Sequence, residues 1–161
     1  MVIRSPVVSD EVGQSIAATP VYPVGVDAAG APVSIGYTDA AGYPAGSTIL
    51  QGSSGNVAAA SASVTLASAT SQTVYLTGFD FTFTGATATS KVVATITGLA
   101  GGTRSYVIAV PAGVDVAGQP LALRFDPPLK AAATATDVVL SVPSLGAGNT
   151  NATLNAQGFR V

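Results

Sequence analysis

Apolar residues recur at every second position in one segment after another from about residue 56 onward. Phe79, Phe81 and Phe83 alternate with polar residues, and the same pattern recurs in 62–66, 92–96, 106–110, 121–125 and 138–142. Successive side chains of a β-strand point to opposite faces of a sheet, so this alternation indicates strands with one buried face. The three phenylalanines are predicted to be core residues, the alternative being a carbohydrate-stacking platform.

No segment repeats its apolar residues with the 3.6-residue period of an α-helix. The Ala-rich stretch 56–70 is the best helical candidate, but its Ser and Thr content and the alternation within 62–66 favour a strand. Seven or eight short strands separated by Gly, Pro, Ser and Asn predict an all-β protein. We expect an antiparallel β-sandwich, either jelly-roll-like or immunoglobulin-like, and favour the jelly-roll-like form.

Residues 1–50 lack this regular alternation. Their prolines fall among short apolar pieces, and proline removes an N–H donor that the interior of a sheet needs. We therefore expect residues 1–50 to form an extended, Pro/Gly-rich N-terminal arm with hairpin turns, and residues 51–161 to form the β-sandwich domain.

The pattern Asp-x-Ala-Gly-x-Pro occurs three times, as VDAAGAP at 26–32, TDAAGYP at 38–44 and VDVAGQP at 114–120. Asp is favoured at the first position of a type I turn, Gly three residues later tolerates a left-handed backbone, and Pro suits the start of a strand. A calcium loop needs several closely spaced oxygen side chains, whereas each copy supplies one. The pattern therefore predicts hairpin turns rather than metal sites.

Two glycines coincide with a change of phase in the alternation. Apolar residues occupy even positions before Gly78 and Gly158 and odd positions after them. A β-bulge produces a one-residue change of this kind, and the alternative is that each strand ends at its glycine.

The sequence offers little catalytic chemistry. It contains no His and no Cys, and Glu11 is its single Glu. Asp80 and Asp126 are the candidate pair for carboxylate chemistry, which needs two acids held about 5–10 Å apart. The alternative is two separate aspartates in water or in ion pairs. We predict that the protein is not an enzyme and has no catalytic residues, no cofactor and no metal site.

Charged residues make up only 9% of the chain, against about 25% in ordinary globular proteins. The net charge is −2 and no basic run occurs, which argues against a nucleic-acid partner. No apolar run of 18 residues occurs, so we expect no membrane-spanning helix and no membrane partner. A surface so poor in charge predicts an oligomer, or a subunit docked on a large assembly.

The arm carries the candidate partner-binding residues. Tyrosine is favoured at interfaces, and apolar side chains in an extended arm are costly to leave in water. The alternative is that the arm packs on its own domain. The candidates are Val21, Tyr22, Val24, Val33, Ile35, Tyr37 and Tyr43.

Three stretches carry a resemblance to a known group of proteins. They are GSSGNVAAASASVTLASATSQTVYLTGFDFT, TITGLAGGTRSYVIAVPAG and LGAGNTNATLNAQGFRV, within residues 46–161. In its composition and in these short stretches of sequence, the chain resembles small β-sandwich virion proteins of tailed bacteriophages. These include capsid decoration (cement) proteins and the heads of short fibres.

This resemblance implies a jelly-roll-like homotrimer that binds the major capsid protein and stabilises the outer surface of a phage head after synthesis in the host cytoplasm. No functional residue is carried over, because the group has no catalytic motif to match. The first alternative is a fibre, spike or tail adaptor component that binds a receptor or glycan. The second is a carbohydrate-binding β-sandwich module.

Overall fold

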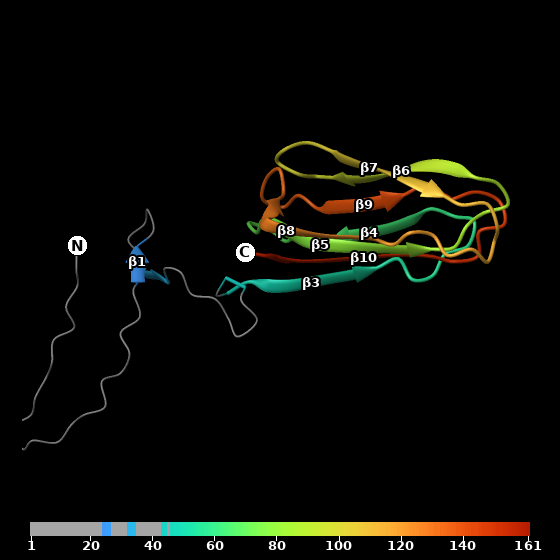
Figure 1. Ribbon diagram of the computed structural model, residues 1–161. Coiled ribbons are helices and arrows are strands. Elements are labelled where there is room, and N and C mark those ends of the chain that lie inside the picture. Colours follow the sequence, from blue (N-terminus) through green and yellow to red (C-terminus); the bar gives the residue numbers. More distant parts are fainter. Residues whose placement is uncertain (1–23, 27–31, 35–42, 45) are drawn as a thin grey trace, which may run out of the picture. The chain divides into compact units, whose positions relative to one another are not determined.

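The computed structural model describes residues 24–26, 32–34, 43–44 and 46–161 (Figure 1). Every regular element within these ranges is a β-strand, as the alternation predicts. The chain divides into two units, Met1–Ala45 and Gly46–Val161.

The strands described in the first unit form an antiparallel hairpin. β1 (Val24–Val26) pairs with β2 (Pro32–Ser34), and Val26 lies opposite Pro32. These two residues are the ends of the first Asp-x-Ala-Gly-x-Pro copy, so the hairpin expected there is confirmed. Pro32 begins its strand, a position at which a missing N–H is tolerated.

The second unit is an antiparallel β-sandwich of two four-stranded sheets. One sheet has the order β3-β10-β5-β8 and the other β4-β9-β6-β7. Figure 1 shows the strands running along the length of this unit, with connecting loops at its two ends. The strands are β3 Thr48–Ser53, β4 Ala62–Leu66, β5 Val74–Phe83, β6 Ser90–Thr97, β7 Arg104–Val110, β8 Leu121–Lys130, β9 Val138–Val142 and β10 Ala152–Arg160.

Alternate side chains of both sheets fill the interior. Phe79, Phe81 and Phe83 of β5 are at most 6% exposed, so their prediction as core residues is confirmed. In β4 the residues Ala62, Val64 and Leu66 are buried, and the helical alternative for 56–70 is wrong. Burying each large apolar side chain contributes about 1.5–3 kcal/mol to folding relative to leaving it exposed.

The strand β3 extends the sandwich toward the N-terminus beyond the expected boundary between residues 50 and 51. It begins at Thr48 and pairs along its length with β10. Its inward positions are Leu50 and Gly52, and a Cβ on Gly52 would overlap the side chain of Val64 in the other sheet. The glycine therefore lets the two sheets approach closely at this edge.

The predicted bulge at Gly78 is confirmed, whereas the phase change at Gly158 has another cause. Gln157 of β10 lies opposite Gly78, and the next pair skips Thr77, which is an extra residue of β5. The pairing of β10 with β3 is continuous through Gly158. The strand β10 therefore has no extra residue of its own. The apparent change of phase arises because the apolar residue Phe159 lies at an outward position, on the same face as Gln157.

The third Asp-x-Ala-Gly-x-Pro copy also lies at a turn, and Pro120 directly precedes β8 as expected, but the predicted roles of Asp115 and Gly118 are wrong. The N–H of Val116 donates to the carbonyl of Gly113 (3.0 Å), which puts Asp115 at the third position of the turn. Gly118 has no left-handed backbone. A Cβ there would overlap the ring of Phe83, and the Gly118 N–H donates to the carbonyl of the same residue (2.9 Å). Close packing on that ring is what requires glycine.

One acidic side chain joins the start of β9 to the loop after β4. The Oγ of Ser68 donates to Asp137 Oδ1 at 2.6 Å, and the Ser68 N–H donates to the same oxygen at 2.7 Å. These two bonds, the side-chain bond first, hold the pKa of Asp137 below its ordinary value of 3.8 because they stabilise the carboxylate.

The stability contributed by this pair is expected to disappear in acid. The folded-state pKa is the lower one, so the contribution is fully present above about pH 3.8 and is lost as the pH falls through the folded-state pKa. Ser68→Ala, which removes the stronger bond, should lower the melting temperature near neutral pH and have a smaller effect in strong acid. Thermal unfolding of both proteins across about pH 2–7 measures this. An equal difference at every pH would contradict the assignment.

Candidate functional site

The outer face of the sheet β3-β10-β5-β8 is ordered in rows that cross all four strands. We call it the polar face, after its residues Gln51, Ser53, Asp80, Arg124, Asn155 and Gln157. Outward side chains of neighbouring strands meet in these rows because the pairs are in register. From the register, the rows are Ser53–Asn155–Asp80–Ala122, Gln51–Gln157–Gly78–Arg124 and Ile49–Phe159–Tyr75–Lys130.

The first row contains a carboxylate and an amide in direct contact. The Nδ2 of Asn155 donates to Asp80 Oδ2 at 2.7 Å, and both side chains are half-buried. This bond sets the orientation of the amide, whose Oδ1 then remains an acceptor. The second carboxylate oxygen of Asp80 accepts no hydrogen bond from the described residues.

The second row is held by a guanidinium that crosses a strand. A Cβ on Gly78 would lie 2.7 Å from Nη1 of Arg124, so the absence of a side chain there gives the guanidinium room to lie over β5. With its oxygen turned toward Arg124, the amide of Gln157 accepts from the guanidinium nitrogens at 3.2 Å. Thr77, the extra residue of β5, donates through Oγ1 to the carbonyl of Gln157 at 3.0 Å and so bonds β5 to β10 at this row.

The third row is aromatic. The rings of Tyr75 and Phe159 are stacked, with centroids 5.0 Å apart and planes 9° from parallel. Ile49, beside Phe159 on β3, is 47% exposed. Phe159 itself is only 6% exposed, so the apolar surface beside the polar rows comes chiefly from Ile49.

An open depression of about 460 Å³ lies over the first two rows. Side chains of Gln51 and Ser53 from β3, Asp80 from β5, and Asn155 and Gln157 from β10 line it. It therefore combines one carboxylate, three amides and one hydroxyl, a mixture of donors and acceptors suited to a hydrogen-bonding ligand.

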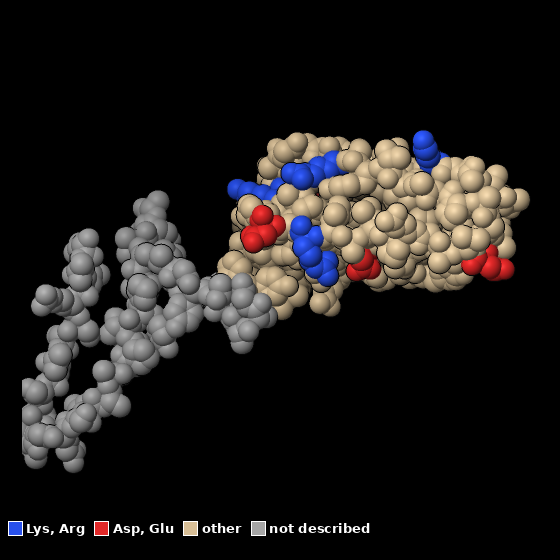
Figure 2. All heavy atoms as spheres, viewed as in Figure 1, with Lys and Arg blue, Asp and Glu red and all other residues tan. Residues whose placement is uncertain are grey.

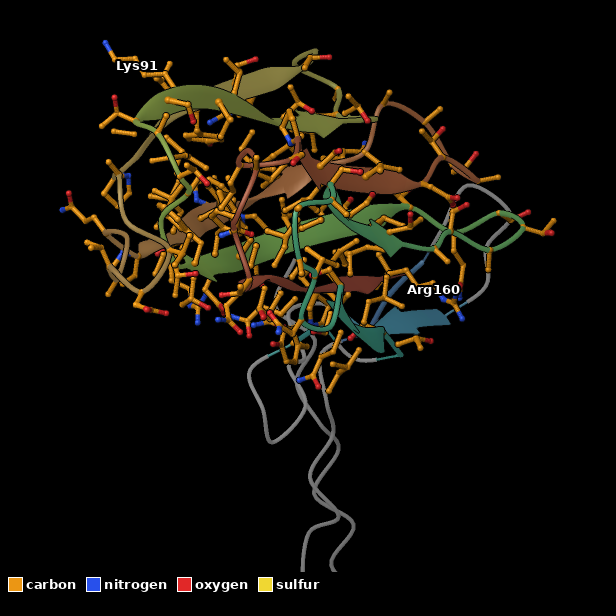
Figure 3. All side chains as sticks on the ribbon, turned by 90° about the vertical axis from the view of Figure 1, so that its right-hand side faces the viewer. Lys91 and Arg160 are labelled. Atoms are coloured by element: carbon orange, nitrogen blue, oxygen red, sulfur yellow. The ribbon has the colours of Figure 1, made fainter. Side chains whose placement is uncertain are left out.

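The outer face of the other sheet differs in chemistry. We call it the neutral face: its outward residues are Ser63, Thr65, Lys91, Val93, Thr95, Thr97, Ser105, Val107, Ala109, Val139 and Ser141. Of these only Lys91 is charged, and Figure 3 shows its side chain pointing away from the sandwich. Val93 and Val107 lie opposite each other and are 43% and 71% exposed. This face offers apolar and hydroxyl surface with almost no charge to desolvate.

The two aspartates considered for carboxylate chemistry are not opposite each other in the sheet. The residue of β8 opposite Asp80 is Ala122, whereas Asp126 lies in the irregular part of β8 between Arg124 and Leu129. Among the described residues no group of three or more His, Cys, Asp or Glu side chains is placed to hold a metal ion.

The candidate partner-binding residues belong to the first unit. Val24 and Val33 lie in β1 and β2, and Tyr43 is half-buried. Val21, Tyr22, Ile35 and Tyr37 lie outside the described residues, as does most of the second Asp-x-Ala-Gly-x-Pro copy.

Sequence reasoning missed Gln51, Arg124, Asn155 and Gln157 as candidates. A signal was present in the last strand, where Asn155 and Gln157 occupy the positions opposite in phase to buried Leu154 and Ala156. Two amides on one outer face are a usable indication of a polar surface.

No helix long and apolar enough to cross a membrane occurs in the ranges that the structure describes. Comparisons with protein-family models, curated proteins and solved structures give no match to this chain.

Proposed function

We propose that the protein is a structural component of a virus particle, a decoration protein that binds the outer surface of a phage head as a homotrimer. The neutral face is the observation that carries this proposal. Exposed valines on a face of small hydroxyl and aliphatic residues allow subunits to pack without burying unpaired charge. Figure 2 likewise shows broad stretches of the second unit's surface without charged side chains.

We infer that the sandwich is a jelly roll. Counted from β3 as the first strand, the two sheets have the orders 1-8-3-6 and 2-7-4-5. This order interleaves early and late strands in each sheet, as two nested Greek keys do. The arrangement supports the resemblance to virion proteins, in which this fold is common.

The mechanism requires no chemistry. A protein that binds the assembled shell but not its separated subunits stabilises the shell by mass action. In this proposal the neutral face joins the three subunits, and the N-terminal arm contacts the major capsid protein.

The location and copy number of the protein in purified particles test this function. Hundreds of copies per particle on the head surface are expected for a decoration protein. Tens of copies or fewer at the tail would replace this proposal with the fibre, spike or adaptor alternative, and absence from particles would overturn both.

Val107→Glu is expected to convert the trimer into monomers, because it places a charge at the most exposed apolar position of the neutral face. Light scattering at micromolar concentration measures the oligomeric state, and circular dichroism checks that the strands remain. Val116→Glu is the matched control, since Val116 is 47% exposed but lies in the loop before β8. A monomeric unmodified protein, or a Val107→Glu protein that stays trimeric, would contradict this use of the face.

A further inference from the structure

We propose that the depression on the polar face binds a neutral oligosaccharide. The site lies on the opposite sheet from the neutral face, so this inference does not depend on the proposed virion function. Its volume of about 460 Å³ is within the roughly 300–1,000 Å³ typical of small-ligand sites.

The groups around the depression match the chemistry of sugar hydroxyls. Asp80 presents a carboxylate oxygen that accepts no bond from the described residues, and the Asn155 Oδ1 is a second acceptor. Gln51 supplies an amide with both donor and acceptor atoms from the neighbouring edge strand. Each sugar hydroxyl both donates and accepts, so adjacent hydroxyls can bridge a carboxylate and an amide on neighbouring strands.

Contacts within the site hold two of these groups in place before any ligand binds. Asn155 is oriented by its 2.7 Å bond to Asp80, and Gln157, with its oxygen turned toward Arg124, by the guanidinium at 3.2 Å. Ordering side chains during binding costs affinity, so groups already fixed by neighbours bind more tightly. An unorganised polar surface would lack these side-chain pairs.

Other ligand classes fit less well. A phosphate or sulfate would lie against the carboxylate of Asp80, and no Lys or Arg side chain is among those that line the depression. A calcium ion needs six to eight oxygen ligands, normally including more than one carboxylate, and Asp80 is the single carboxylate lining the depression. An apolar ligand would leave the amides and the carboxylate desolvated and unpaired.

Nuclear magnetic resonance titration of the full chain tests the proposal with defined probes. Lactose, maltose, cellobiose and N,N′-diacetylchitobiose are the neutral disaccharides, and 3′-sialyllactose is the acidic counterpart of lactose. At least one neutral probe should bind at millimolar concentration and shift the side-chain amide signals of Gln51, Asn155 and Gln157. A screen of longer neutral oligosaccharides extends the same readout.

Asp80→Asn removes the charged acceptor with little change in shape and should weaken binding by about tenfold. Gln51→Ala, on the edge strand, should weaken it less. Gln119→Ala is the matched control, because Gln119 is an exposed amide outside the depression. The proposal is overturned if no neutral saccharide binds, if the shifts map elsewhere, or if Asp80→Asn and Gln119→Ala behave alike.

Discussion

Gly98→Ala is expected to lower the free energy of unfolding by about 3–5 kcal/mol. Gly98 follows β6 with φ of +82°, a left-handed conformation that costs a residue with a Cβ about 1–2 kcal/mol. A Cβ there would also overlap the carbonyl oxygen of Asp137 at the start of β9. Backbone and not a flexible side chain would have to move, so the cost exceeds that of the dihedral angle alone.

The surroundings of Gly98 resist such a movement. Its own carbonyl accepts from the Ala132 N–H at 2.8 Å, while the Asp137 side chain is held by Ser68. A shift of either strand end would therefore strain or break existing hydrogen bonds.

The same turn supplies two matched controls. Gly102 has φ of +82° with no atom within 4 Å of an added Cβ, so Gly102→Ala should cost only about 1–2 kcal/mol. Gly101 has open space and no left-handed backbone, so Gly101→Ala should be neutral or raise stability by up to about 1 kcal/mol. Urea unfolding of the three variants gives the comparison. Equal losses for Gly98→Ala and Gly102→Ala would show that the overlap with Asp137 is relieved without cost.

The strands of the sandwich were predictable wherever large apolar residues mark the inner face. Phe79, Phe81 and Phe83 identify β5 because each inward position is unambiguous. The edge strand β3 was missed because one of its inward positions is Gly52, which carries no hydrophobic signal and is fixed by contact with Val64. In the sequence, a glycine that is required by contact with a distant residue cannot be told apart from a glycine that is required by a turn.

Gly118 illustrates the same difficulty. Its place in the Asp-x-Ala-Gly-x-Pro pattern suggested a left-handed turn residue, whereas the structure requires glycine for contact with Phe83. The hairpin at the first copy was predicted correctly, because there the flanking strands are adjacent in sequence. The pattern therefore predicted the pairing of two strands that are close in sequence, but not the contact with Phe83 that requires glycine at position 118.

The polar depression could not be assembled from sequence because its rows depend on which strands become neighbours. Asp80 and Asn155 are 75 residues apart and meet only because β10 lies between β3 and β5. Arg124 reaches Gln157 by lying over Gly78. The alternation of apolar residues shows a change of phase at Gly78, but it does not show which side chain lies over that glycine. Strand order, rather than strand content, determines this site.

Deletion of residues 1–45 is expected to abolish the proposed binding to phage heads while leaving the sandwich folded. The cut falls at the boundary between the two units and before β3, which begins at Thr48, so all eight strands of the sandwich are retained. The removed segment contains the candidate partner residues Val21, Tyr22, Val24, Val33, Ile35, Tyr37 and Tyr43. At about 25 cal/mol per Å² of apolar area, burying several such side chains against a partner contributes several kcal/mol, enough to change affinity by orders of magnitude.

Three measurements on the truncated protein distinguish an arm that docks on the particle from one that holds the trimer together. If the arm docks, the melting temperature and trimeric mass should stay close to those of the full chain, while co-sedimentation with heads lacking the protein should be lost. A full-length variant with Tyr22, Tyr37 and Tyr43 replaced by Ser should show the same loss without a change in chain length. If the truncated protein unfolds or separates into monomers, the arm belongs to the trimer. If it still co-sediments, the contact with the head lies on the sandwich and the docking role of the arm is wrong.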